Sequence, residues 1–216
     1  MEELVRLENC FKPEFADAGC DEAGRGCYAG PVFAAAVILP SNFYHPLLND
    51  SKQVKAADRE LLRVYIEKQA LAFSVAMVGV EEIDTINILK ASQKAMHLAL
   101  DNLSVTPQFV SVDGNYFIPY KTLPHQCIIK GDGKYAHIAA ASILAKTYRD
   151  QYMRSLHDSF PHYNWFSNKG YGTLEHRLAI NNHGLTVHHR KSFKITSPQL
   201  EIFEERAIPN SCDTEG

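Results

Sequence analysis

The chain lacks the features of a membrane protein or of a secreted, disulfide-rich protein. No uninterrupted apolar run approaches the ~20 residues that a membrane-spanning helix needs, and the acidic N-terminus, residues 1–6, has no apolar segment typical of a secretory signal. The five cysteines are odd in number, far apart, and form no Cys-x-x-Cys pair. We therefore expect neither a disulfide framework nor a zinc site, but a cytoplasmic protein with no membrane partner.

Nothing in the composition indicates disorder or a second large domain. Apolar residues make up 45% of the 216 residues, which is ordinary for a globular protein. This length is sufficient for one domain with a full core. We expect a lead-in over residues 1–16, a folded domain with a helical C-terminal part over residues 17–197, and an acidic tail over residues 198–216.

The net charge of −3 does not indicate a nucleic-acid partner, but the distribution of charge along the chain does. Residues 120–200 contain 11 Lys and Arg residues against 4 Asp and Glu residues, while the segments before and after are acidic. A basic segment of this kind is typical of proteins that bind a polyanion. Charges that intermix in the folded molecule would give the same counts, so this observation leaves both interpretations open.

The apolar pattern predicts an α/β protein. Five apolar runs are expected to form strands: one that leads into Asp21 and ends at Gly24 and Gly26, and residues 32–39, 71–80, 109–112 and 126–130. Helical spacing is found at residues 56–70, 81–103, 138–160 and 173–182. In the first of these helices, one side carries Leu61, Leu62, Tyr65 and Ile66; the apolar positions of the second are Ile83, Ile86, Leu89, Met96 and Leu100. Because strands come first and then alternate with helices, we expect a mixed sheet of about five strands with helices on its faces.

Three acidic positions each follow an apolar run that is expected to form a strand: Asp21-Glu22, Asp113 and Asp132. Functional sites in open α/β sheets lie at strand ends, where loops converge. Carboxylates gathered there would repel one another unless a cation held them, and Mg²⁺ and Mn²⁺ prefer oxygen ligands. Two such ions, about 3.5–4 Å apart, would serve phosphodiester hydrolysis.

Each of these acids also has a purely structural interpretation. Asp113 and Asp132 precede glycines and are ordinary turn residues, and Asp132 is also placed to cap the following helix. Asp21 and Glu22 are neighbours, which point to opposite faces of a regular strand. Both serve one site only if the backbone leaves β geometry there, which the nearby glycines permit.

Asp150 is a further acid, which we leave out of the expected metal site. It lies within a predicted helix, four residues before Arg154. An exposed ion pair between residues four apart on a helix is the simplest explanation of its presence.

The chain also resembles a known family. Asp21-Glu22-Ala23-Gly24-Arg25-Gly26, followed by Ala29-Gly30-Pro31-Val32, is similar to the opening signature of ribonuclease HII. Seven further blocks of that family follow in the family's order: Asn49-Asp50-Ser51-Lys52, Ile86-Asn87-Ile88-Leu89, Val112-Asp113-Gly114-Asn115, Ile129-Lys130-Gly131-Asp132, Ala139 to Lys146 with Arg149-Asp150, Lys169-Gly170-Tyr171-Gly172-Thr173, and His188 to Phe193. The blocks cover roughly residues 17–195, and chance does not explain such an ordered series.

The resemblance implies a ribonuclease H-like catalytic domain, with a mixed five-stranded sheet flanked by helices and a helical C-terminal part. It implies that Asp21, Glu22, Asp113 and Asp132 are the catalytic carboxylates, which bind one or two Mg²⁺ or Mn²⁺ ions. The implied activity is hydrolysis of the RNA strand of RNA–DNA hybrids and cleavage 5′ of ribonucleotides in duplex DNA, leaving 3′-hydroxyl and 5′-phosphate ends. Both nucleic acids are expected partners, bound by a monomer.

The resemblance also assigns residues to nucleic-acid binding. Gly24, Arg25 and Gly26 would surround the 2′-hydroxyl, the group that marks RNA, and Tyr171 would stack next to the cut and sense the RNA-to-DNA junction. Four basic residues are expected to hold phosphates without reading sequence: Lys52, Lys146, Arg190 and Lys191. A position on the solvated surface explains these four basic residues equally well, and for Lys146 the alternative explanation is a structural ion pair. Cys27 stands where the family pattern has a proline, and we expect it to be a small buried side chain.

Three other functions compete with this interpretation. Ribonuclease HIII would carry an extra N-terminal domain, for which about 20 residues before Asp21 are too few. A catalytically silent hybrid-binding module would not need four acids. A two-metal phosphatase for small molecules would leave Tyr171 and the basic segment unexplained.

Overall fold

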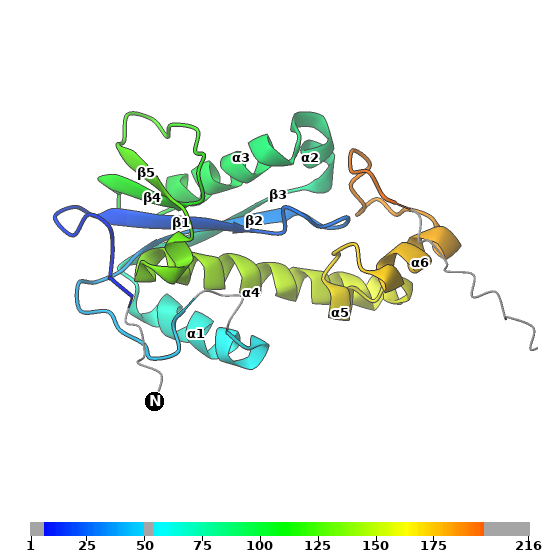
Figure 1. Ribbon diagram of the computed structural model, residues 1–216, viewed down its shortest axis with the longest axis horizontal. Helices are drawn as coiled ribbons and strands as arrows, with labels where there is room; N and C mark the ends of the chain where they lie inside the picture. The colour runs from blue at the N-terminus through cyan, green and yellow to red at the C-terminus, as the bar shows by residue number, and fades with distance from the viewer. Residues whose placement is uncertain (1–6, 50–53, 197–216) are drawn as a thin grey trace, which may run out of the picture.

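The computed structural model describes residues 7–49 and 54–196. Its centre is a five-stranded sheet with helices on both faces (Figure 1). The strands are β1 (Asp17–Ala23), β2 (Val32–Ile38), β3 (Ala72–Val78), β4 (Phe109–Asp113) and β5 (His125–Ile128). They lie in the order β3-β2-β1-β4-β5, with β2 antiparallel to both β1 and β3, β4 parallel to β1, and β5 parallel to β4. The mixed five-stranded sheet predicted from the sequence is confirmed.

The helices form two layers and a C-terminal extension (Figure 1). The α-helices are α1 (Ala56–Gln69), α2 (Val80–Ile86), α3 (Ile88–Asp101), α4 (Ala136–Ser159), α5 (Trp165–Asn168) and α6 (Leu174–His183), with short 3₁₀ helices η1 (Gly131–Gly133) and η2 (Pro161–Tyr163). Helices α2 and α3 cover one face of the sheet, α1 and α4 cover the other, and α5 and α6 lie beyond the end of α4.

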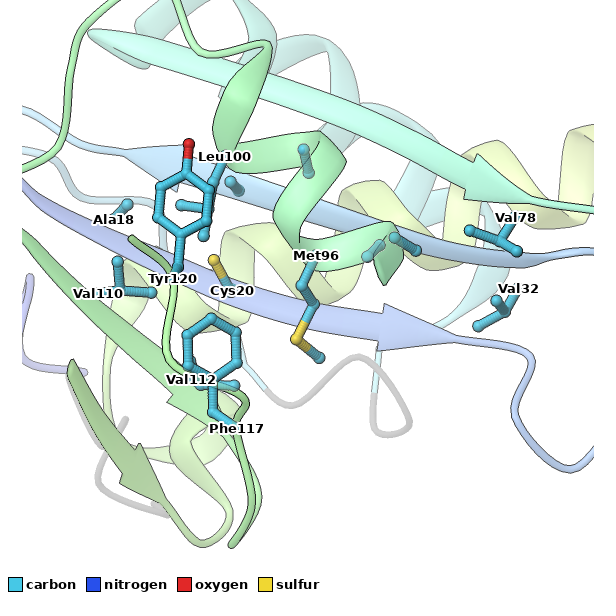
Figure 2. Packing of buried hydrophobic residues seen from close by; sticks show 14 of the residues in the cluster. Ala18, Cys20, Val32, Val78, Met96, Leu100, Val110, Val112, Phe117 and Tyr120 are labelled. Carbon is cyan, nitrogen blue, oxygen red and sulfur yellow. The ribbon is translucent and has the colours of Figure 1, made fainter. Parts of the chain in front are cut away.

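Strand β2 is buried at every position because helices cover both of its faces. On one face its side chains meet those of β1 and α3, and Figure 2 shows Met96 of α3 close to Cys20 of β1. On the other face, Ala35 and Val37 pack with the alanine-rich start of α4. That helix crosses β1 so closely that a Cβ at Gly19 would collide with the backbone of His137. Small residues thus bring α4 directly against the strand that carries Asp21.

The single helix predicted over residues 81–103 is wrong, because the chain breaks at Asn87 into α2 and α3. Asn87 has a left-handed φ of 69°, and its side chain accepts a hydrogen bond from the amide of Lys90 as the N-cap of α3. Leu61 and Leu89, two apolar positions of these helical patterns, are exposed. Helix α5 was not predicted either, since four residues are too few to show a helical period.

Of the two predicted terminal segments, only the lead-in is described, and only from residue 7 on. The lead-in reaches the start of α4, where the amide of Ala136 donates to the carbonyl of Glu8 at 2.7 Å. The predicted acidic tail, 198–216, lies outside the described residues. Within residues 7–49 and 54–196, no helix is long and apolar enough to cross a membrane.

Candidate active site

Three aspartates from distant parts of the chain meet at one edge of the sheet. Asp21 lies on β1, Asp113 ends β4 and Asp132 lies in η1, and one carboxylate oxygen from each lies within 4.8 Å of the others. Strands β1 and β4 are parallel neighbours, with Cys20 opposite Val112, so the next residue of each strand reaches the same edge. Asp113 Oδ1 accepts a hydrogen bond from the amide of Gly131 at 2.7 Å, which ties η1 to β4.

The electrostatics of this group fit a bound cation. Asp21 and Asp132 are buried. Burial raises the pKa of Asp21 well above its ordinary value, and the charges of Glu22 and Asp113 raise it further, although a hydrogen bond with Ser142 of α4 opposes them. Three carboxylates held this close repel one another. Their oxygens form the donor set that hard divalent cations prefer, so the residues present fit such an ion.

Glu22, the fourth expected carboxylate, is not part of the three-aspartate group. Strand β1 keeps regular pairing with β2 at Asp21 and Glu22, so the departure from β geometry that would let both side chains serve one site does not occur. The two side chains therefore leave opposite faces of the strand. The carboxylate of Glu22 forms an ion pair with Arg25 at 3.0 Å, and it remains close enough to raise the pKa of Asp21.

The capping alternative for Asp132 is not found in the structure. Helix α4 begins at Ala136, and its N-cap residue, Tyr135, makes no side-chain capping hydrogen bond. Asp132 instead lies in η1, with its carboxylate in the three-aspartate group.

Asp150 is excluded from the metal group, but the ion pair predicted for it is wrong. Its carboxylate is buried and pairs with Arg59 at 3.6 Å and with Lys146 at 3.7 Å, whereas Arg154 pairs with Glu60 at 3.4 Å. One partner of Asp150, Arg59, thus comes from helix α1, and the other, Lys146, comes from the preceding turn of α4 rather than from the next turn.

The segment after β1 needs glycine at position 24. Gly24 has a φ of +95°, and a Cβ there would collide with the guanidinium of Arg149. The neighbouring Arg25 side chain is half exposed. The segment Gly24-Arg25-Gly26 thus begins one residue after Asp21-Glu22, and the guanidinium of Arg25 pairs with the carboxylate of Glu22.

Tyr171 lies next to this segment. Its backbone forms a β-bridge with Cys27, and the residue as a whole is 41% exposed. Cys27 is fully buried, as expected of a small side chain in this turn. Burial raises the pKa of the Tyr171 phenol, and the adjacent Cys27 raises it further. Tyr171 is thus held beside the glycine segment with part of its ring facing solvent.

The expected phosphate-binding residues have different surroundings. Arg190 is fully buried and donates to three backbone carbonyls, which differs from the expectation that it holds a phosphate. Lys146 forms the structural ion pair with Asp150 that was its alternative explanation. Lys191 is exposed, and Lys52 lies outside the described residues.

Sequence reasoning gave no role to Ser142 and Arg149. Ser142 hydrogen-bonds Asp21, and Arg149 is buried with three carbonyl partners. Both fall inside motif blocks, which is the one sequence signal that marks them.

Comparisons with known proteins agree with this geometry. The sequence model of the family described as Ribonuclease HII matches residues 18–196. Ribonuclease HII of Christiangramia forsetii is 57% identical over 90% of this chain and 98% of its own length, and that of Bacteroides thetaiotaomicron is 59% identical over 84% and 91%.

Solved structures of ribonucleases H2 and HII are also similar to this chain, at lower sequence identity. Ribonuclease H2 of Pyrococcus horikoshii has a TM-score of 0.68 at 25% identity, covering 83% of this chain and 94% of its own. Ribonuclease HII of Archaeoglobus fulgidus, solved in complex with PCNA, has a TM-score of 0.70 at 26% identity, covering 87% and 100%. The chain belongs to the ribonuclease HII family of endoribonucleases.

Proposed function

We propose that this chain is an endonuclease that hydrolyses the RNA strand of RNA–DNA hybrids and cuts 5′ of ribonucleotides in duplex DNA, leaving 3′-hydroxyl and 5′-phosphate ends. The observation that carries this proposal is the convergence of Asp21, Asp113 and Asp132 within 4.8 Å beside the segment Gly24-Arg25-Gly26. A site for a metal ion with oxygen ligands thus lies next to the positively charged Arg25 side chain. The peptide groups of the same segment are suited to contact the sugars and phosphates of a nucleic acid.

The catalytic carboxylates are Asp21, Asp113 and Asp132, with Glu22 beside them. They would hold one or two divalent ions, Mg²⁺ or Mn²⁺. When bound, such ions activate water and stabilise the leaving oxygen of a phosphodiester. The amide of Gly131 and the hydroxyl of Ser142 orient Asp113 and Asp21 for that task.

Recognition of the substrate is assigned to the neighbouring segments. Gly24, Arg25 and Gly26 contact the ribonucleotide, whose 2′-hydroxyl distinguishes it from a deoxyribonucleotide. Tyr171 stacks next to the cut, and its partly exposed ring supports this role. Lys191, Lys146 and Lys52 contact phosphates; Lys191 is exposed, and the side chain of Lys146 is partly so.

We further propose that the protein acts as a monomer in the cytoplasm. A single chain supplies all three aspartates of the cluster, which supports activity without a second copy. Cys10, Cys20, Cys27 and Cys127 are free thiols, as a reducing compartment would keep them.

The carboxylate assignment is tested by Asp113→Asn, with Asp158→Asn as the matched control on an exposed site. We expect Asp113→Asn to lower turnover by more than about 100-fold, since even outer partners of metal ligands are worth about 10–100-fold. Binding of a hybrid duplex, measured by fluorescence anisotropy, should remain. Near-normal turnover of Asp113→Asn would show that the carboxylate assignment is wrong.

The role of Tyr171 is tested by Tyr171→Ala against Tyr116→Ala, which removes another exposed tyrosine. Loss of stacking should reduce cleavage at a single ribonucleotide more than cleavage of a long hybrid, because a long hybrid has no RNA-to-DNA junction at most sites. Equal losses on the two substrates would refute junction sensing.

A further inference from the structure

Two arginines, Arg149 of α4 and Arg190 in the segment after α6, are buried beside the candidate active site. They are 1% and 0% exposed. Arg149 donates hydrogen bonds to the carbonyls of Pro31 (3.1 Å), Lys169 (2.9 Å) and Ala29 (3.1 Å). Arg190 donates to those of Gly30 (2.9 Å), Arg25 (2.9 Å) and Gly24 (2.7 Å). Every guanidinium nitrogen of both residues thus holds a different backbone carbonyl.

Neither guanidinium forms an ion pair with a carboxylate among residues 7–49 and 54–196. Buried arginines ordinarily have such a partner, because burying an unpaired charge costs several kcal/mol. Burial lowers the pKa of Arg190 to about 10, so the side chain is still charged at neutral pH. Backbone carbonyls accept all the hydrogen bonds of these two guanidinium groups, and five of the six carbonyls belong to residues 24–31.

Arg190 therefore controls how the segment Gly24-Arg25-Gly26 faces solvent. With the carbonyls of Gly24 and Arg25 directed at the buried guanidinium, the Arg25 side chain, 51% exposed, lies on the outer side. The amide of Arg190 also donates to the carbonyl of Tyr28 at 2.8 Å, which fixes the same turn from a further point.

Arg149 joins this turn to the segment that carries Tyr171. It holds the carbonyls of Ala29 and Lys169 with one guanidinium, which lies 5.8 Å from the centre of the Tyr171 ring. The amides of Tyr28 and Ala29 donate to the carbonyl of Gly170 at 2.8 and 3.2 Å. The two segments assigned to substrate recognition are thus bound to each other and to α4.

We propose that Arg149 and Arg190 are positioning residues, which fix the segment Gly24-Arg25-Gly26 and Tyr171 relative to the aspartate cluster, so that cleavage at a ribonucleotide depends on both. The inference rests on the proposed function. Neither residue contacts substrate; each acts through the backbone that it holds. Displacement of reacting groups by about 1 Å can cost about 100-fold in rate, so loosening this turn should lower turnover more than affinity.

The test uses Arg190→Lys and Arg149→Lys on a DNA duplex with one ribonucleotide. Lysine keeps the positive charge but lacks the planar fork that reaches three carbonyls. We expect kcat to fall about 10–100-fold, with KM changed little and with the salt dependence of duplex binding equal to that of the unaltered protein. Arg154→Lys, which alters a partly exposed arginine that pairs with Glu60 and holds none of the six carbonyls, should leave kcat unchanged.

A phosphate-binding role for Arg190 would give the opposite result. Lysine would then preserve turnover, while Arg190→Ala would weaken binding and reduce the salt slope by about 1. That result, or an unchanged kcat in both lysine variants, overturns the proposal. Absence of cleavage by the unaltered protein would instead contradict the proposed function, so the two failures are distinguishable.

Thermal melting of each variant precedes the kinetics, because loss of a buried arginine can prevent folding. If the lysine variants do not fold, Phe193→Leu replaces them. The Arg190 guanidinium lies 5.0 Å from the centre of the Phe193 ring, and leucine removes that support while leaving all six carbonyl contacts possible. We expect a kcat loss of about 2–5-fold at unchanged KM; an unchanged kcat in a folded Phe193→Leu variant refutes positioning by Arg190.

Discussion

The buried histidines of the C-terminal part make the stability of the protein depend on pH in a direction that the structure specifies. His189 is fully buried, and its Nδ1 accepts a hydrogen bond from the amide of Thr186 at 2.9 Å. Its Nε2 lies 3.2 Å from Nε2 of His176, which also accepts from Trp165 Nε1 at 3.0 Å. This network suits neutral rings, since a proton added at His189 Nδ1 would displace the Thr186 amide.

The size of the effect follows from the pKa of His189. Burial, together with the neighbouring His176 and His188, lowers this pKa from 6.5 to about 4. Between these two values the unfolded chain binds a proton that the native protein does not, so the free energy of unfolding falls as pH decreases from 6.5 toward 4. At pH 5 the loss from this residue is about 2 kcal/mol, from ~1.4 kcal/mol per pKa unit.

Urea unfolding of the unaltered protein and of His189→Asn at about pH 7 and about pH 5 measures this contribution. The unaltered protein should lose about 2 kcal/mol more than the variant on acidification, whatever the variant costs at neutral pH. His183→Asn, which removes an exposed histidine, should behave like the unaltered protein. Equal pH dependence of unaltered protein and His189→Asn would refute the assignment of a neutral, buried His189.

Three further predictions follow from single residues. Gly24→Ala should lower the free energy of unfolding by about 1–3 kcal/mol in urea titrations, because its left-handed φ and its contact with Arg149 exclude a Cβ. Burial opposes ionisation of Asp17, but the close His137 ring, whose Nε2 lies 3.2 Å from Asp17 Oδ2, and hydrogen bonds from Ser111 and the amide of Lys12 hold the pKa of Asp17 below its ordinary value. The stabilisation is therefore lost as pH falls below about 4, and Asp17→Asn should lower the melting temperature at neutral pH and lose less stability on acidification. Lys191→Ala should reduce the salt slope of duplex binding by about 1.

Much of the fold was predictable because its signals are local. The apolar run 32–39 became β2, and the alanine-dense start of the long helix became the close contact of α4 with β1 at Gly19. The break at Asn87 was missed because it depends on a single left-handed residue and its side-chain cap, which do not disturb the apolar spacing on either side. Exposed Leu61 shows the same limit, since spacing does not tell which apolar residue at the edge of a helix face meets the sheet.

The three aspartates of the candidate site could be predicted from the sequence, but the contacts of the residues around them could not. Asp21, Asp113 and Asp132 each follow an apolar run, and strand order alone brings such residues to one edge. The buried state of Arg190 and the partner of Asp150 depend on segments far apart in the chain, which packing brings together. Arg190, a basic residue in a basic segment, was therefore predicted to contact a phosphate, although its guanidinium faces inward.

The most direct test of the whole account is cleavage of a DNA duplex that contains one ribonucleotide, compared with the same duplex made of DNA alone. With Mg²⁺ or Mn²⁺ we expect one cut, 5′ of the ribonucleotide, no cut in the all-DNA duplex, and no cut in EDTA. Equal cleavage of both duplexes, or cleavage that survives EDTA, would contradict a metal-dependent site built from Asp21, Asp113 and Asp132 that recognises the 2′-hydroxyl.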